Sequence, residues 1–267
     1  MKKLILFIIV AFSLLTGCSK SLIQIFDTAT TNTKLSDGCY VFENDTVKIT
    51  YSFWESQGVM SFSIFNKLNK PLYIDWKNCS YIANGLKFNY WMDETQTNQA
   101  NYYGAYYYKG PLLQPGITVT EGVQIGSSST VKPERITFIP PKSYSIRSQF
   151  YLLPVKWFKM SSNSRMTIEP RNDKQSRKTK VYTETFDPKN TPLRFRNFIA
   201  ISLSETSQDF DFIDNEFYLT SVKEMDYRHY RGKCLGKDKH FNNRYGEPIY
   251  KKNTSFYIED LKAKWYE

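Results

Sequence analysis

Two histidines and a cysteine lie close together in the stretch Tyr227–His240, YRHYRGKCLGKDKH, and these are residue types that could bind metal or act in catalysis. Zinc sites have a tighter ligand pattern, however, and the five lysines and arginines of this stretch would repel a cation. His229 and His240 are the only histidines of the chain, which restricts any Ser/His or Cys/His pair. We interpret the stretch as a solvated basic loop, and we expect neither a metal nor another cofactor.

Acidic residues offer a second kind of chemistry. The stretch Asp209–Glu216, DFDFIDNE, has four acids, but an EF-hand calcium loop needs glycine at its sixth position, where this stretch has Asp214. We interpret it as a solvated turn before a strand that begins at Glu216. No Gly-x-Ser-x-Gly motif is present in the sequence, and the Ser-rich stretch Gly126–Thr130 has no partner residues beside it. The sequence therefore assigns no catalytic residue.

Tyrosines form the clearest candidate for ligand contact. They lie in the stretch Asn101–Gly110, NYYGAYYYKG, as Tyr102, Tyr103, Tyr106, Tyr107 and Tyr108. Exposed tyrosine rings offer a large contact area at little cost in conformational entropy, and they suit sugar stacking or protein contact. The alternative is a hairpin whose rings cover an edge of the fold. We predict a contact surface for a protein or glycan partner.

Basic residues are concentrated in the stretch Arg171–Lys180, RNDKQSRKTK, which contains a single acid. The five are Arg171, Lys174, Arg177, Lys178 and Lys180. The sequence is compatible with an exposed hairpin loop that makes no specific contact. Clustered cations beside a membrane also attract anionic lipid, so the sharper hypothesis is a contact for a phosphate-bearing lipid or an acidic partner.

Cys18 follows a short apolar run near the N-terminus. Lys2 and Lys3 precede residues 4–15, in which only Ser13 is polar, and this pattern is typical of a secretory signal. The run is too short for a transmembrane helix, which needs about 20 apolar residues.

The four residues Leu15-Thr16-Gly17-Cys18 resemble the lipobox of bacterial lipoproteins. The resemblance implies that the thiol of Cys18 takes up a diacylglyceryl group, that residues 1–17 are cleaved off, and that the freed amine is acylated with a fatty acid such as palmitate. Two or more acyl chains anchor a protein stably. The lipid bilayer is therefore the expected partner of Cys18, and an ordinary signal peptide that happens to end near a cysteine is the alternative.

The residues after Cys18 bear on localisation. Ser19 occupies the position at which aspartate retains enterobacterial lipoproteins in the inner membrane, so the outer membrane is favoured. No acid occurs before Asp27, whereas surface-exposed Bacteroidota lipoproteins carry an acidic run there. We therefore expect the periplasmic face of the outer membrane.

The charge balance restricts the partners. Removing Lys2 and Lys3 with the signal leaves 34 basic residues against 26 acidic ones, a net charge of +8. Such a charge favours anionic surfaces, and an exported protein is not expected to bind nucleic acid. Three cysteines remain besides Cys18, and they allow either one disulfide and one free thiol or three thiols: Cys39, Cys79 and Cys234.

The elements that must position these residues are mostly strands. In Thr46–Trp54 apolar and polar residues alternate, which is the period of a half-buried strand. Similar segments, separated by Gly and Pro turns, predict strands over residues 59–66, 70–76, 117–125, 135–139, 145–153, 180–186, 193–204, 216–225 and 254–258. A weak helical turn is expected over 259–266. Many short strands favour an antiparallel β-sandwich.

These patterns predict three regions. We expect a signal peptide over residues 1–17, a lipidated flexible tether over 18–37, which is rich in Thr, Ser and Asn, and a β-sandwich domain with long loops over 38–267. A division of that domain near residues 155–190 is left open.

Three blocks of the sequence resemble a group of uncharacterised Bacteroidota lipoproteins: FSIFNKLNKPLYIDWKNCSYIANG (Phe62–Gly85), IPPKSYSI (Ile139–Ile146) and TPLRFRNFIAISLSE (Thr191–Glu205). The resemblance implies an Ig-like β-sandwich in the cell envelope and transfers no catalytic residue. Our leading hypothesis is a non-enzymatic envelope lipoprotein that binds a protein or glycan or serves as a structural subunit. The alternative is a hydrolase that acts on envelope polymers through carboxylates that the fold brings together.

Overall fold

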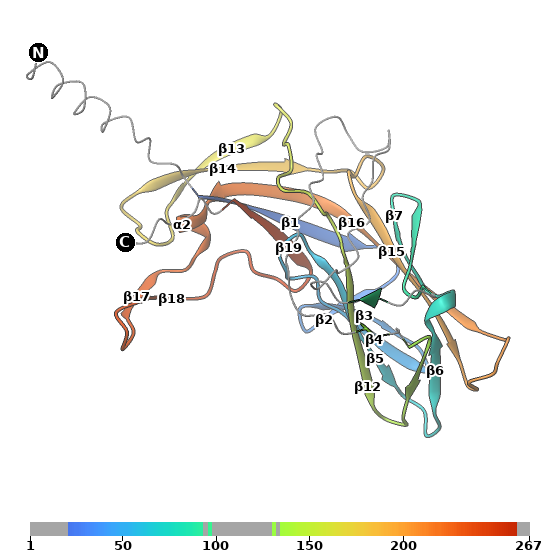
Figure 1. Cartoon of the computed structure of the whole chain (residues 1–267). Coiled ribbons are helices and arrows are strands. Elements are labelled where there is room, and N and C mark those ends of the chain that lie inside the picture. The colour runs from blue at the N-terminus through green and yellow to red at the C-terminus, as the bar shows by residue number, and fades with distance from the viewer. Residues whose placement is uncertain (1–20, 93–95, 98–129, 132–133, 261–267) are drawn as a thin grey trace, which may run out of the picture.

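The computed structural model describes residues 21–92, 96–97, 130–131 and 134–260 (Figure 1). These residues form two antiparallel sheets that enclose a common core, so the predicted mostly-β sandwich is confirmed. Two short ribbons, one 3-10 turn and one short α-helix accompany the sheets in this part of the chain. No helix among the described residues is long and apolar enough to cross a membrane.

The larger sheet has ten strands. Its main path is β11-β6-β15-β16-β1-β19, and β7, β8, β13 and β14 are attached beside β15 and β16. The strands are β1 (Leu22–Thr30), β6 (Leu72–Asp75), β7 (Ser80–Ala83), β8 (Leu86–Asn89), β11 (Ile136–Ile139), β13 (Arg165–Pro170), β14 (Lys178–Thr185), β15 (Arg194–Ser202), β16 (Asp211–Asp226) and β19 (Ser255–Asp260).

The smaller sheet has five strands in the order β12-β5-β4-β3-β2. They are β2 (Lys34–Ser36), β3 (Cys39–Glu43), β4 (Val47–Tyr51), β5 (Val59–Asn66) and β12 (Tyr144–Tyr151). The remaining elements are the 3-10 turn η1 (Trp76–Asn78), the helix α2 (Tyr227–Tyr230), and the ribbons β9 (Gln96–Thr97) with β10 (Thr130–Val131) and β17 (Cys234–Lys237) with β18 (Asn243–Tyr245).

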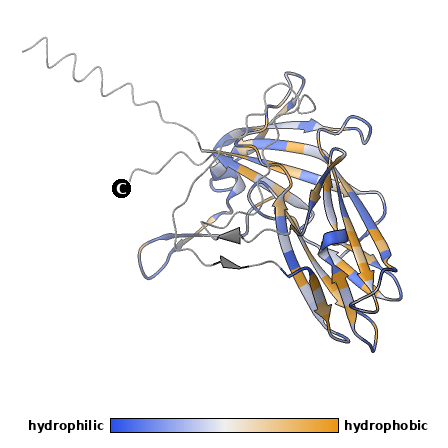
Figure 2. Cartoon of the chain, turned by 45° about the vertical axis from the view of Figure 1, so that its right-hand side comes forward, coloured by the Kyte–Doolittle hydropathy of each residue, from blue (hydrophilic) through white to orange (hydrophobic). Residues whose placement is uncertain are grey.

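The core lies between the two sheets and is rich in aromatic rings. Along β4 the residues Val47, Ile49 and Tyr51 are fully buried, and Lys48 and Thr50 between them face outward, as the alternation in the sequence predicts. Figure 2 shows the same alternation of hydrophobic and hydrophilic residues along many of the strands. Phe53 and Phe217 meet edge to face, with ring centroids 5.1 Å apart, between the two sheets.

A chain of buried polar groups crosses this apolar core. The Tyr90 hydroxyl donates to Asn197 Oδ1 at 2.8 Å, and Asn197 Nδ2 donates to the Tyr51 hydroxyl at 3.2 Å. The Tyr51 hydroxyl in turn donates to Asn215 Oδ1 at 2.8 Å. Burial raises the pKa of Tyr51. Because Tyr51 belongs to the smaller sheet and both asparagines belong to the larger one, these bonds fix the position of one sheet on the other.

The predicted tether over residues 18–37 is wrong from Leu22 onward. Residues 22–30 form β1, which pairs with β16 on one side and β19 on the other. Ile23, Ile25 and Phe26 are fully buried. The second half of this segment, DTAT, lacks the apolar alternation that predicts a strand, and a tether was expected for that reason. The backbone pairing with β16 nevertheless continues through these residues as far as Thr30. The sandwich therefore begins only a few residues after Cys18.

The division left open near residues 155–190 does not occur. β13 and β14 form a hairpin, and β14 pairs with β16 from Val181↔Met225 to Thr185↔Ser221. This hairpin therefore extends the large sheet. The acidic stretch 209–216 also differs from the expected turn, because β16 begins at Asp211 and pairs with β15 over these residues.

Candidate binding surfaces

A groove with a floor of small residues lies on the outer face of the smaller sheet. Ser52, Ser61 and Ser148 come from three neighbouring chain segments and form a row across them. The backbone N–H of Ser52 donates to the Ser61 carbonyl at 3.1 Å, and the Ser61 and Ser148 hydroxyl oxygens are 2.7 Å apart. Because serine side chains are short, the row leaves a depression of about 470 Å³.

Aromatic and amide side chains form the walls of this depression, which we call the serine groove. Its lining residues are Ser52, Trp54, Glu55, Ser56, Gln57, Val59, Ser61, Ser148 and Tyr151. Trp54 is half-buried and packs against Tyr257 of β19, with ring centroids 5.1 Å apart. One aromatic wall is therefore held in place by the larger sheet.

The loop between β4 and β5 is tied to both sheets. The Gln57 N–H donates to the Tyr257 carbonyl at 2.6 Å, and the Leu153 N–H donates to the Gln57 carbonyl at 3.0 Å. Gly58 has φ of +64°, and a β-carbon there would lie 2.7 Å from Phe256 Cγ. Glycine is therefore required at this position, and the groove rests on a loop that the surrounding strands hold firmly.

The chemistry of the serine groove suits a neutral polar ligand. Serine hydroxyls and the Gln57 amide both donate and accept hydrogen bonds, and Trp54 and Tyr151 offer aromatic surface. Among the described residues of the lining, Glu55 is the only charged one. The volume lies within the range of small-molecule sites. Sugars have this combination of hydroxyl groups and apolar C–H faces.

A second groove, of about 570 Å³, lies beside the β13–β14 hairpin and is basic in character. We call it the basic groove, and its lining includes Leu22, Ile168, Lys178, Lys180, Glu224 and Arg228. Lys178 and Lys180 are exposed, and Ile168 is 59% exposed. Three of the predicted anionic-surface residues, Arg171, Lys178 and Lys180, thus line the same groove as Leu22, the first residue of β1.

Arg171 does not contribute a free charge to this surface. It is only 8% exposed, and its guanidinium makes two hydrogen bonds to the Asp173 carboxylate, at 2.7 and 2.6 Å. The ion pair lowers the pKa of Asp173. Lys174 and Arg177 are exposed in the hairpin loop, as expected. The sequence could not separate Arg171 from its neighbours, because the ion pair forms only when the loop closes.

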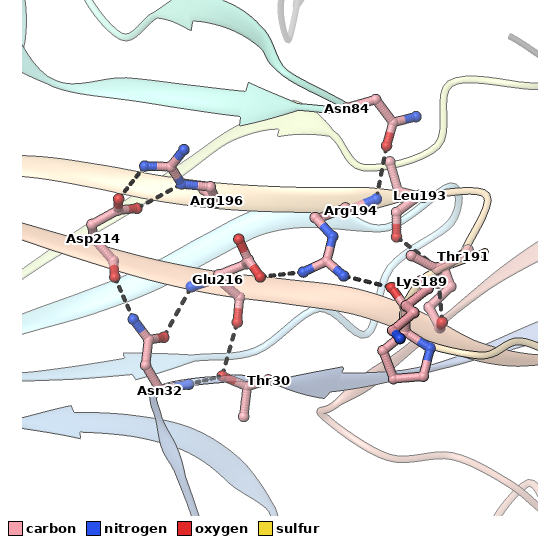
Figure 3. A network of polar contacts seen from close by, with 12 residues as sticks. Thr30, Asn32, Asn84, Lys189, Thr191, Leu193, Arg194, Arg196, Asp214 and Glu216 are labelled. Atoms are coloured by element: carbon pink, nitrogen blue, oxygen red, sulfur yellow. Dashed lines mark hydrogen bonds and ion pairs between the residues drawn. The ribbon is translucent and has the colours of Figure 1, made fainter. Parts of the chain in front are cut away.

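Acids on the outer face of β16 are paired with arginines of β15. Arg196 binds Asp214, and Arg194 binds Glu216 (Figure 3). Asn32 joins this network, since its Nδ2 donates to the Asp214 carbonyl at 2.6 Å and its Oδ1 accepts from the Glu216 N–H at 3.0 Å. These carboxylates therefore stabilise the sheet.

The cysteines and histidines of the described residues differ in their burial. Cys79 is buried, Cys39 is half-buried and Cys234 is exposed, and all three are free thiols. Burial raises the pKa of Cys79 to about 12.

His229 is buried in α2, and its Nδ1 accepts a hydrogen bond from the Asn172 N–H at 3.2 Å, whereas His240 is exposed. Residues outside the described part of the chain are Cys18, Tyr102, Tyr103, Tyr106, Tyr107 and Tyr108.

The residues of the serine groove were not predicted as a site. The strands that carry Ser61 and Ser148 were expected, and so was the turn after Trp54, but only the pairing of Ser61 with Ser148 places the serines side by side. A register between strands 87 residues apart cannot be read from one sequence.

No protein-family model matches the chain, and no curated protein and no solved structure matches it either.

Proposed function

We propose that this protein is a lipid-anchored lipoprotein of the bacterial envelope whose β-sandwich binds a neutral glycan in the serine groove without transforming it. The lipobox ending at Cys18 supports the anchor, Ser19 supports the outer membrane, and the absence of an acid between Cys18 and Asp27 supports its periplasmic face. β1 begins at Leu22, so only a few residues separate the sandwich from the proposed anchor.

The observation that carries the glycan assignment is the row of three serines in a lining that also contains Trp54 and Tyr151. Aromatic side chains supply contact area for apolar sugar faces, and the hydroxyls and the Gln57 amide supply donors and acceptors that fix orientation. A neutral ligand fits better than an anion, because the lining residues that the structure describes include Glu55 and no lysine, arginine or histidine. The tyrosine stretch 101–110 stays a second predicted contact surface.

A matched pair of variants on β12 tests this assignment. Ser148→Arg places a long side chain in the groove, whereas Ile146→Arg places the same side chain on the same strand face but outside the lining. Both positions are exposed, so neither change is expected to unfold the protein. We expect Ser148→Arg to weaken binding of a neutral oligosaccharide at least tenfold, or about 1.4 kcal/mol, and Ile146→Arg to leave it unchanged.

The measurement is isothermal titration with short β-linked N-acetylglucosamine and glucose oligomers, supported by tryptophan fluorescence because Trp54 lines the groove. Saturable binding that only Ser148→Arg weakens supports the assignment. Equal affinities for the two variants, or no binding of any neutral oligosaccharide, would remove it.

A further inference from the structure

The β17–β18 ribbon exposes an aromatic ring at its tip in a strained backbone conformation. Phe241 is 80% exposed and has φ of +63°, a left-handed conformation that is unusual for a bulky residue. Leu235, on the first strand of the same ribbon, is 64% exposed. The exposure of these two apolar side chains and the backbone strain at Phe241 both disfavour the folded state. The stability of the fold therefore does not explain why the ribbon has them.

The tip is well defined despite its exposure. The Asp238 carboxylate accepts from the N–H groups of His240 and Asn242 at 2.8 and 2.9 Å, and the Asp238 N–H donates to the Asn242 carbonyl at 2.8 Å. The Phe241 N–H donates to the Asp238 carbonyl at 3.1 Å. These bonds hold the backbone of the loop that carries Phe241 at its apex.

Basic residues flank Phe241 in the sequence of the ribbon. Lys237 and Lys239 precede it and Arg244 follows it, and all three are exposed. Asp238 is the one acid between Cys234 and Tyr245, and the bonds described above occupy its carboxylate. An apolar ring at the tip with basic residues on either side of it complements the interface of an anionic bilayer, where lipid phosphates lie above the acyl chains.

The position of the ribbon also favours a membrane partner. It follows α2, and the N–H of Tyr227, the first residue of α2, donates to the Ser21 carbonyl at 3.0 Å. Ser21 is three residues after Cys18, and three extended residues span at most about 11 Å. Figure 1 shows the start of β1, α2, the β13–β14 hairpin and the β17–β18 ribbon at the same end of the molecule.

We propose that the β17–β18 ribbon docks on the anionic bilayer to which the chain is anchored, with Phe241 in the headgroup region and Lys237, Lys239 and Arg244 on the lipid phosphates. The exposed lysines of the β13–β14 hairpin, at the same end of the sandwich, add to this basic surface. The orientation beside the anchor rests on the proposed lipidation of Cys18, whereas the affinity for anionic lipid does not.

Vesicle binding tests the proposal without the acyl chains. The mature chain from residue 18, carrying Cys18→Ser, is sedimented with phosphatidylcholine vesicles that contain about one-third phosphatidylglycerol or none. We expect binding to the anionic vesicles only, and loss of that binding near 1 M salt. Each basic residue at an anionic surface contributes roughly fivefold, so Lys237→Gln/Lys239→Gln/Arg244→Gln should weaken binding roughly 100-fold.

A control variant removes the same charge elsewhere on the sandwich: Lys34→Gln/Lys70→Gln/Lys87→Gln, at three exposed lysines. It should bind the anionic vesicles much more tightly than the ribbon variant. Equal losses in the two triple variants would show a non-specific effect of net charge and overturn the proposal.

Phe241→Gly separates docking from a structural role. Glycine relieves the left-handed backbone, so the melting temperature should stay the same or rise, while vesicle affinity falls about fivefold because the ring is lost. Unchanged vesicle affinity would contradict insertion of the ring, and a fall in melting temperature would show that Phe241 serves the fold instead.

Discussion

A Gly58→Ala variant is expected to lose about 3–5 kcal/mol of its free energy of unfolding, from backbone strain and overpacking together. The backbone at Gly58 has φ of +64°, which alanine adopts only with strain. The new methyl group would also lie 2.7 Å from Phe256 Cγ and 3.0 Å from Leu152 Cδ1, both in the buried core. Chemical denaturation of the purified variant measures the loss.

Gly38→Ala is the matched control for this effect. Gly38 has a similar φ of +73°, but no atom lies within 4 Å of the position of its β-carbon. It should therefore show the backbone strain alone, about 1 kcal/mol. Equal stability of the two variants would contradict the close packing of the β4–β5 loop against β19. It would also contradict the rigid support that this loop provides for the serine groove.

An Asn197→Leu variant is expected to lose about 2–4 kcal/mol, because leucine keeps the volume but leaves buried partners without hydrogen bonds. The Tyr90 hydroxyl loses its acceptor and the Tyr51 hydroxyl loses a donor. Both tyrosines are buried, so water cannot replace these bonds. Denaturation curves measure the effect, and Asn69→Leu at an exposed position should change stability by less than about 0.5 kcal/mol.

A double-mutant cycle shows whether the loss comes from the hydrogen bond. Tyr90→Phe removes the hydroxyl that donates to Asn197, so Asn197→Leu should cost less in the Tyr90→Phe background than in the native protein. Strictly additive losses would contradict the buried polar chain between the two sheets.

Alternation of apolar and polar residues predicted much of the sandwich. The segment 59–66 coincides with β5, and the segment 193–204 contains β15. β1 was missed altogether, because a strand paired on both sides gains its stability from neighbours about 200 residues later in the sequence. The acidic turn before Glu216 was wrong for a related reason, since Asp214 forms an ion pair with Arg196 on the adjacent strand.

The candidate site depends on registers that the sequence does not contain. Ser52, Ser61 and Ser148 looked like ordinary outward-facing strand residues, and they form a groove only when β4, β5 and β12 align. The basic residues of 171–180 were found from the sequence because a charge cluster is local. The burial of Arg171 against Asp173 was not, because it depends on the folded loop.

Mass spectrometry of the N-terminal peptide, purified from the membranes of a bacterial host that processes lipoproteins, shows whether Cys18 carries the proposed lipid anchor. We expect a chain that begins at Cys18 and carries a thioether-linked diacylglyceryl group and an acylated amine, and a Cys18→Ser variant that lacks both. A native chain with a free thiol at Cys18, released into the soluble fraction, would contradict the proposed anchor.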